Sequence, residues 1–182
     1  MSKKVLILHG WGGSDFPHWQ SWLASELAKS YGKVSFLEFS DFEFPDLELW
    51  KSELLFELTS FKPDIVICHS LANTLWFHVV GEVSEIEKLY LVAPPSFHCA
   101  VEEIQEFFPL ALPTKTSAKE SLLIASTNDP YMTLDEAKSL QKSLNIPIKV
   151  LENAGHINTQ SGYGKWPWIL EELKKDLKKA LD

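Results

Sequence analysis

The sequence predicts an α/β protein, with a mostly parallel sheet of about six strands between two layers of helices, in one domain over residues 1–182. Two observations support this prediction. Short, almost wholly apolar runs recur along the chain, and such runs are typical of strands that are covered on both faces. Longer amphipathic stretches separate these runs, and this alternation favours parallel strands joined by right-handed crossovers.

The expected strands are six short runs rich in Val, Ile and Leu. They are Val5–Leu8, Val34–Glu38, Ile65–Cys68, Leu89–Val92, Leu122–Ala125 and Ile148–Leu151. Five helices are expected between and after them, because apolar residues recur there three or four positions apart. Their apolar stripes are Trp19, Trp22, Leu23 and Leu27; Leu54, Leu55 and Leu58; Leu71 to Val80; Leu134, Ala137, Leu140 and Leu144; and Ile169, Leu173, Leu177 and Leu181.

Three features refine this plan. Pro167 suits the first turn of the last helix, where a missing N–H is harmless. Two connections are long, Phe39–Glu48 and Ala93–Lys119. A loop of that length in a small domain is usually functional or contains a short helix, for which Glu102–Phe108 is the candidate.

The composition argues against several classes of partner. The chain has 17 Lys and Arg against 25 Asp and Glu, a net charge of -8, which disfavours binding to nucleic acid or to an anionic membrane surface. No apolar stretch approaches the length of a membrane span, and Val5–Leu8 is too short for a signal-peptide core. Two cysteines, Cys68 and Cys99, are too few for a disulfide scaffold, so we expect reduced thiols and a cytoplasmic location.

The pentapeptide Cys68-His69-Ser70-Leu71-Ala72 stands where the third expected strand gives way to a helix. A serine on a sharp strand-to-helix turn is exposed for nucleophilic attack, and the preferred pattern for that turn is G-x-S-x-G. Small residues replace both glycines here, so the match is loose. Two interpretations stay open from this segment alone: Ser70 is a nucleophile, or Ser70 caps the following helix and His69 is an ordinary turn histidine.

Two more polar residues follow expected strands. Asp129 comes after the fifth strand, where Asp-Pro also suits a simple turn, and His156 lies in a polar loop after the sixth. Asp135 and Glu152 are weaker candidates for an acid, since one lies in a helix pattern and the other directly follows a strand. The chain order Ser…Asp…His is that of α/β-hydrolases, and all three positions would meet at one sheet edge. We therefore predict a triad of nucleophile Ser70, base His156 and orienting acid Asp129.

An oxyanion hole needs two backbone N–H groups that point at the developing negative charge. The N–H of Leu71 is one candidate, because N–H groups at a helix start lack intrahelical partners. The N–H of Trp11 is the other, in the loop HGWGGS, whose glycines permit close approach of the backbone. This loop lacks the lysine of a phosphate-binding loop and the G-x-G-x-x-G spacing, so a nucleotide site is not expected.

Four segments together resemble a known family: HGWGGSDFPHWQSWL, CHSLA, STNDPYM and GHINTQSGYGKWP. They are similar to the compact α/β-hydrolases grouped with retinoblastoma-binding protein nine and the bacterial YdeN-like proteins. The resemblance spans nearly the whole chain. It implies a serine hydrolase with a reduced α/β-hydrolase fold, strand order 2-1-3-4-5-6, no cap domain, no cofactor and no metal. Carried over by motif, the triad falls on Ser70, Asp129 and His156.

The chain departs from the family pattern at two points. Cys68 occupies the usual first glycine of the elbow, which tightens the turn. The motif L-x-C-x-E is absent, so binding to the retinoblastoma protein is not expected.

The expected reaction is hydrolysis of a carboxylic ester or amide of a small substrate through an acyl-enzyme. Without a cap domain, short acyl groups are expected. Candidate pocket residues are His69 and seven large aromatics, although such aromatics are more often core. The aromatics are Trp11, Trp19, Phe97, Phe107, Phe108, Tyr131 and Trp166. The rival interpretations are a protein-interaction module on the same fold and, with less support, a flavodoxin-like nucleotide-binding protein.

Overall fold

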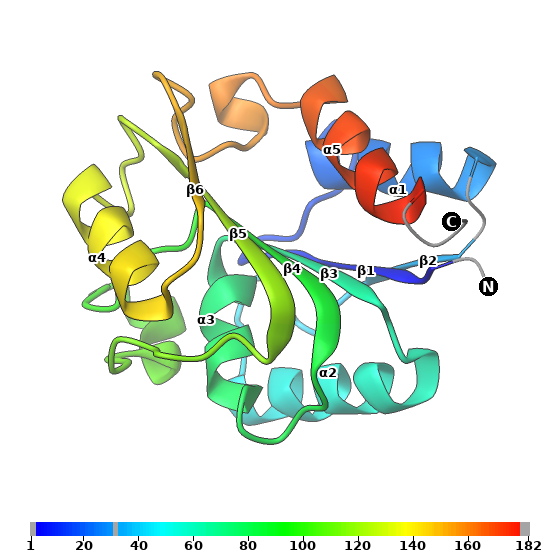
Figure 1. The fold of residues 1–182 in the computed structure, drawn as a ribbon. Helices are drawn as coiled ribbons and strands as arrows, with labels where there is room; N and C mark the ends of the chain where they lie inside the picture. Colours follow the sequence, from blue (N-terminus) through cyan, green and yellow to red (C-terminus); the bar gives the residue numbers. More distant parts are fainter. Residues whose placement is uncertain (1–2, 31–32, 179–182) are drawn as a thin grey trace.

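The computed structural model describes residues 3–30 and 33–178, and its centre is a six-stranded parallel sheet (Figure 1). The observed strand order, β2-β1-β3-β4-β5-β6, confirms the predicted one. The strands are β1 Val5–Leu8, β2 Val34–Leu37, β3 Ile65–His69, β4 Ile86–Val92, β5 Ala118–Ser126 and β6 Ile148–Leu151. All five strand pairings are parallel, so the carboxyl ends of the strands meet at one edge of the sheet.

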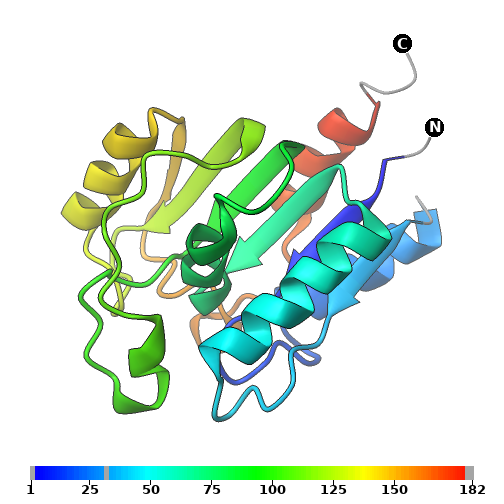
Figure 2. The same ribbon diagram turned by 90° about the horizontal axis from the view of Figure 1, so that it is seen from below.

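In the described part of the chain, five α-helices cover the two faces of this sheet. They are α1 Trp19–Ser30, α2 Leu47–Phe61, α3 Leu71–Val79, α4 Leu134–Leu144 and α5 Pro167–Lys178. Figure 1 shows α1 and α5 on one face, and Figure 2 shows α2 and α3 in front of the opposite face. The sheet thus separates two apolar cores, and the predicted three-layer sandwich is confirmed.

The predicted helix starts and stripes match these helices closely. Pro167 is the first residue of α5, as expected. Thr133 and Glu136 form a capping box that fixes the start of α4. The last residue of the predicted α5 stripe, Leu181, lies outside the described residues. The candidate helix in the second long connection is a 3-10 helix over Glu102–Phe107.

Two strands begin earlier than the sequence predicts. β4 starts at Ile86 rather than Leu89, and β5 spans Ala118–Ser126 rather than Leu122–Ala125. Both added segments contain charged residues. A prediction that looks for continuous apolar runs therefore assigns them to loops. In the folded sheet the backbone pairing of β4 with β5 includes these residues, and the side chains of Lys88 and Glu120 form a cross-strand ion pair at 3.0 Å. At the other ends, β2 stops at Leu37 and β3 continues through His69.

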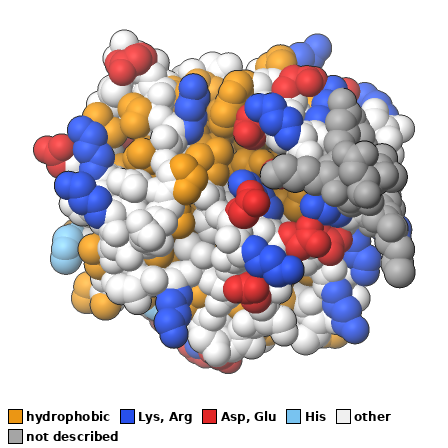
Figure 3. All heavy atoms as spheres, viewed as in Figure 1, with side chains coloured by type: hydrophobic (Ala, Val, Ile, Leu, Met, Phe, Trp, Pro, Cys, Tyr) orange, Lys and Arg blue, Asp and Glu red, His pale blue; other side chains and the backbone are white. Residues whose placement is uncertain are grey.

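The surface carries charges of both signs. Lys and acidic side chains are mixed over the face seen in Figure 3. Elsewhere along the chain, opposite charges also lie close on one helix, as in the pairs Lys29–Glu26 on α1 and Lys175–Glu172 on α5. Among residues 3–30 and 33–178, no helix combines the length and apolar character needed to cross a bilayer.

Candidate active site

Ser70 alone forms the turn between β3 and α3. Its backbone has φ 54° and ψ -125°, a region that costs a non-glycine residue about 1–3 kcal/mol. Its N–H donates to the carbonyl of Val92 on the neighbouring strand at 3.0 Å, which anchors the turn. Its side chain makes no capping hydrogen bond to α3, so the helix-cap interpretation does not describe this serine. The strained turn instead presents the hydroxyl above the sheet edge.

Close packing around the turn explains the residues beside it. A methyl group added to Gly10 would lie 2.7 Å from Cβ of Ser70, so the loop after β1 reaches the turn only because position 10 is glycine. Cys68, at the expected glycine position, turns its side chain into the core on the α2 and α3 side, and Ala72 is also fully buried. The turn therefore accommodates both small side chains without displacing Ser70.

The structure brings the three predicted triad residues into one hydrogen-bonded chain. His156 Nε2 lies 2.8 Å from Ser70 Oγ. On the other side of the ring, His156 Nδ1 lies 3.0 Å and 2.9 Å from the two carboxylate oxygens of Asp129. The side chains of His156 and Asp129 are only 7% and 4% exposed. Because a carboxylate accepts, the ring carries its proton on Nδ1, and Nε2 is free to accept the Ser70 proton.

Each member of this chain follows a different strand. Ser70 follows β3, Asp129 follows β5 and His156 follows β6, so parallel pairing alone brings the three loops together. The weaker acid candidates lie elsewhere. Asp135 is 98% exposed and 4.0 Å from Lys138, and Glu152 accepts from Thr127 at 3.3 Å.

Two polar residues that the sequence analysis did not single out join the Asp129 and His156 loops. Ser126 Oγ accepts from the N–H of Ala154 at 2.9 Å, and Asn128 Oδ1 accepts from the N–H of Gly155 at 2.8 Å. Ser126 also donates to Asn128 at 2.9 Å, so the two side chains form one brace. The run of polar residues after β5 was the available signal, but each of them also suits an ordinary turn.

The loop after β1 reaches the hollow beside Ser70 through Trp11. The N–H groups of Gly12 and Gly13 donate to Phe42 and Gly10 carbonyls at 2.9 and 3.2 Å. Neither Trp11 nor Leu71 donates its N–H to a backbone acceptor within the described ranges, and both residues line the same hollow as Ser70. These two groups remain the predicted oxyanion donors.

His9 orients the peptide that carries the Trp11 N–H. Its Nδ1 donates to the Gly10 carbonyl at 2.7 Å, and its Nε2 accepts from the Phe39 N–H at 2.9 Å. Burial lowers the pKa of His9, which keeps the ring neutral for this pair of bonds. In a trans peptide the carbonyl and the next N–H point in opposite directions, so the Trp11 N–H faces away from His9.

A hollow of about 200 Å³ opens beside Ser70. Its lining consists of Trp11, Ser70, Leu71, Pro95, Cys99, Val101, Ile104, Tyr131, His156, Asn158 and Gln160. One wall comes from the long connection between β4 and β5, which supplies Pro95, Cys99, Val101 and Ile104. None of the lining residues is Lys, Arg, Asp or Glu, so the hollow is uncharged unless His156 is protonated.

The predicted aromatic lining needs correction. Trp11 and Tyr131 line the hollow, but the other large aromatics pack in the cores, and His69 is buried beneath His156. The core residues are Trp19, Phe97, Phe107, Phe108 and Trp166. The physical reason is burial, since removing a large apolar side chain from water is worth about 1.5–3 kcal/mol. Small and medium side chains, among them Pro95 and Val101, form the wall instead.

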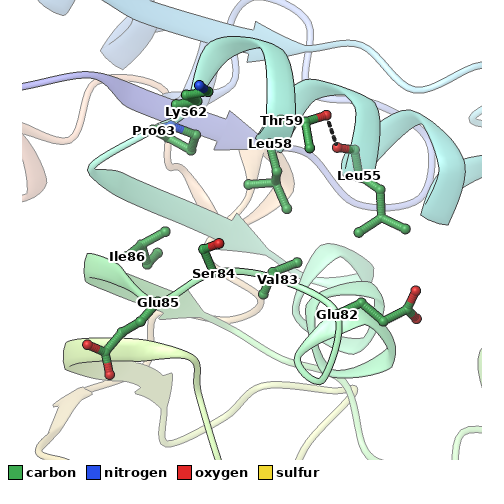
Figure 4. A pocket seen from close by; sticks show the side chains of 10 residues that line it. All are labelled: Leu55, Leu58, Thr59, Lys62, Pro63, Glu82, Val83, Ser84, Glu85 and Ile86. Carbon is green, nitrogen blue, oxygen red and sulfur yellow. Dashed lines mark hydrogen bonds between the residues drawn. The ribbon is translucent and has the colours of Figure 1, made fainter.

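The hollow beside Ser70 is not distinguished by its volume. A larger one of about 350 Å³ lies at the opposite end of the sheet, between α2 and the loop before β4 (Figure 4). Leu58, Val83 and Ile86 give it an apolar interior, and its Thr59 hydroxyl donates to the carbonyl of Leu55 at 2.8 Å. Glu82 and Glu85 also line this hollow, but the printed partners of the hydroxyl are backbone carbonyls, not these carboxylates. Chemistry, not volume, therefore selects the hollow at Ser70.

No cluster of three or more His, Cys, Asp or Glu residues suited to a metal ion occurs in the part of the chain that the structure describes.

The serine hydrolase family model matches residues 5–175. The chain belongs to this family. It is 23% identical to the YdeN hydrolase of Bacillus subtilis, with 95% of each chain covered. The solved structure of the B. subtilis ydeN product superposes with a TM-score of 0.80 at 22% identity, over 96% of this chain and 98% of that one.

Two further solved structures share the fold. A YdeN-like protein of Pectobacterium atrosepticum has a TM-score of 0.78 at 26% identity, over 98% of this chain and 91% of that one. The esterase domain of a Rhodothermus marinus protein has a TM-score of 0.67 at 16% identity, over 94% and 84%. Family and fold together support a hydrolase on the α/β-hydrolase fold, as the resemblance implied.

Proposed function

We propose that this protein hydrolyses carboxylic esters or amides of small, uncharged substrates through an acyl-enzyme formed on Ser70. The observation that carries the proposal is the continuous chain from Asp129 through His156 to Ser70 Oγ, with 2.8 Å between base and nucleophile. Membership of the serine hydrolase family supports the same chemistry.

The first half-reaction forms the acyl-enzyme. His156 Nε2 accepts the Ser70 proton while Oγ bonds to the substrate carbonyl carbon, and the carbonyl electron pair moves onto oxygen. The N–H groups of Trp11 and Leu71 donate to this oxyanion. When the intermediate collapses, the leaving oxygen or nitrogen takes the proton from Nε2 and departs. Asp129 holds the ring and stabilises its charged form throughout.

The second half-reaction releases the acid. Water gives its proton to Nε2 of His156 and attacks the acyl carbonyl. The second tetrahedral intermediate expels Ser70 Oγ, which recovers the proton from Nε2. The site returns to its starting state.

The hollow suggests the substrate class. Its volume of about 200 Å³ is below the roughly 300–1,000 Å³ of sites for drug-sized ligands, which favours a short acyl group. Val101 and Ile104 offer apolar contact, while Asn158 and Gln160 bring amide groups to the same hollow. A chain-length series of p-nitrophenyl esters tests this assignment, and a clear preference for long acyl chains would contradict it.

A fluorophosphonate probe and p-nitrophenyl acetate test the reaction itself. The native protein should be labelled and should turn over the ester, whereas Ser70→Ala should fold normally and do neither. Ser139→Ala is the matched control, because Ser139 is exposed on α4 and its hydroxyl donates to the Asp135 carbonyl of the same helix. An unlabelled native protein would favour the alternative, an interaction module on this fold.

A further inference from the structure

Two buried ring N–H groups hold consecutive carbonyls of the loop that carries the base. His69 Nε2 donates to the His156 carbonyl at 3.1 Å, and Trp19 Nε1 donates to the Ile157 carbonyl at 2.8 Å. His69 is the residue directly before the nucleophile, and Trp19 is the first residue of α1. Both contacts connect distant parts of the chain, 87 and 138 residues apart.

The backbone held by these donors is strained. Ile157 has φ 51°, in the left-handed region, where a β-branched residue is a genuine outlier. Such a conformation costs about 1–3 kcal/mol and persists only where the surroundings enforce it. The Ile157 side chain is fully buried in the core between the sheet and α1, which adds a third restraint. Since Ile157 follows His156 directly, its conformation helps to aim the imidazole.

The two donors are chemically suited to a permanent contact. The indole nitrogen of Trp19 can only donate a hydrogen bond, so it always presents an N–H to the carbonyl. Burial lowers the pKa of His69 well below its usual value, so the ring stays neutral. Because a carbonyl only accepts, that neutral ring carries its proton on Nε2.

Packing fixes the ring of His69 as well as its proton. The ring contacts those of His18 and His156, with centroids 5.0 and 5.3 Å away, and stands perpendicular to the Trp19 ring at 5.7 Å. His69 and Trp19 do not line the hollow beside Ser70. They therefore contact the backbone of the loop that carries His156 and would not contact a substrate held in the hollow.

We propose that His69 and Trp19 are positioning residues that clamp the backbone of the base loop and so hold the His156 ring between Ser70 and Asp129. The clamp rests on the proposed function for its effect on rate. Its effect on the ring itself does not depend on turnover.

The test is the pair His69→Gln and His69→Met. These side chains have similar length, but only Gln has an N–H that can reach the carbonyl of His156. We expect His69→Met to lower kcat on the order of 100-fold, as a displacement of about 1 Å does, with KM nearly unchanged. His69→Gln should recover most of this loss. Trp19→Phe, which removes the second donor, should lower kcat in the same way.

The second readout is the NMR resonance of the His156 Nδ1 proton in its bond to Asp129. It should persist in the native protein and in His69→Gln, and broaden or vanish in His69→Met. Equal kcat values for the Gln and Met variants, or an unchanged resonance in His69→Met, would overturn the clamp. If the native protein were inert towards esters, the proposed function would fail, while the resonance would still decide the clamp.

Thermal unfolding separates positioning from general damage. The Gln and Met variants should unfold at similar temperatures if the difference in kcat arises from the missing N–H. If His69→Met does not fold, Trp19→Phe decides the matter by the same two readouts. A Trp19→Phe protein that folds and keeps native kcat and resonance would refute the clamp.

Discussion

Replacing Asp129 with Asn tests whether this carboxylate sets the tautomer of His156. In the structure Asp129 Oδ1 accepts from the Tyr131 N–H at 2.9 Å, and both carboxylate oxygens lie within 3.0 Å of His156 Nδ1. An Asn side chain keeps the Tyr131 bond only if its oxygen takes the Oδ1 place. Its NH₂ group then replaces Oδ2, which lies 2.9 Å from His156 Nδ1 in the native protein. Two donors cannot share that contact, so the ring can keep its Nδ1 proton only on the remaining 3.0 Å contact to Oδ1, against the new NH₂ group. We expect the proton to move to Nε2 instead, or the ring to turn away.

The expected magnitude separates two explanations. A ring protonated on Nε2 cannot accept the Ser70 proton, and in Ser-His-Asp triads this substitution lowers kcat by about 10⁴, which corresponds to about 5.5 kcal/mol. Loss of one charge-assisted hydrogen bond alone would remove only about 1.5–3 kcal/mol, roughly a 10- to 150-fold effect. We therefore expect Asp129→Asn to lower kcat for p-nitrophenyl acetate by about 10⁴, because the tautomer changes.

The chain offers matched controls for this experiment. Asp135→Asn removes an exposed carboxylate on α4, and Glu152→Gln removes one that contacts Thr127. Both variants should keep native kcat, and all three should retain the circular dichroism spectrum of the native protein. A loss of less than tenfold in Asp129→Asn, or a large loss in either control, would refute the assignment of the acid.

Three further predictions concern stability and access. Tyr90→Phe should lower the free energy of unfolding by about 2 kcal/mol in a denaturant titration, since the buried Tyr90 hydroxyl donates to the carboxylate of Asp176 on α5; an unchanged midpoint would contradict this. Stability should fall as the pH drops from about 6.5 towards 4, because burial lowers the pKa of His18 from 6.5 to about 4 and the unfolded chain alone binds a proton there. The loss from this residue approaches about 3 kcal/mol, and melting temperatures that stay constant over this range would rule it out. A maleimide should label Cys99, which lines the hollow beside the nucleophile, but not Cys68, whose pKa is raised by burial; prior fluorophosphonate labelling should slow the reaction, and equal labelling of both thiols would argue against their placement.

The sequence was most informative about features that depend on the order of neighbouring residues, such as strands. Apolar runs such as Val5–Leu8 and Ile148–Leu151 coincide with β1 and β6, because strands buried on both faces need no polar alternation. The triad candidates followed from the same logic. Ser70, Asp129 and His156 each lie within a few residues of the end of a strand. Parallel strands bring such positions to one edge of the sheet.

The sequence was least informative where the environment of a residue is set by residues far away along the chain. Charged residues hid the first part of β4 and of β5, where backbone pairing continues the ladder and Lys88 meets Glu120 across the strands. The large aromatics looked equally suited to a pocket and to a core, and long-range packing put most of them in the core.

Residue order was therefore sufficient for the layered sheet and for the three side chains of the reactive chain, because both depend on short-range pattern and on parallel pairing. The hollow wall and the contacts of His69 and Trp19 with the base loop emerged only from the folded chain. Those contacts join residues 87 and 138 positions apart, and no local periodicity records which carbonyl a buried ring will meet.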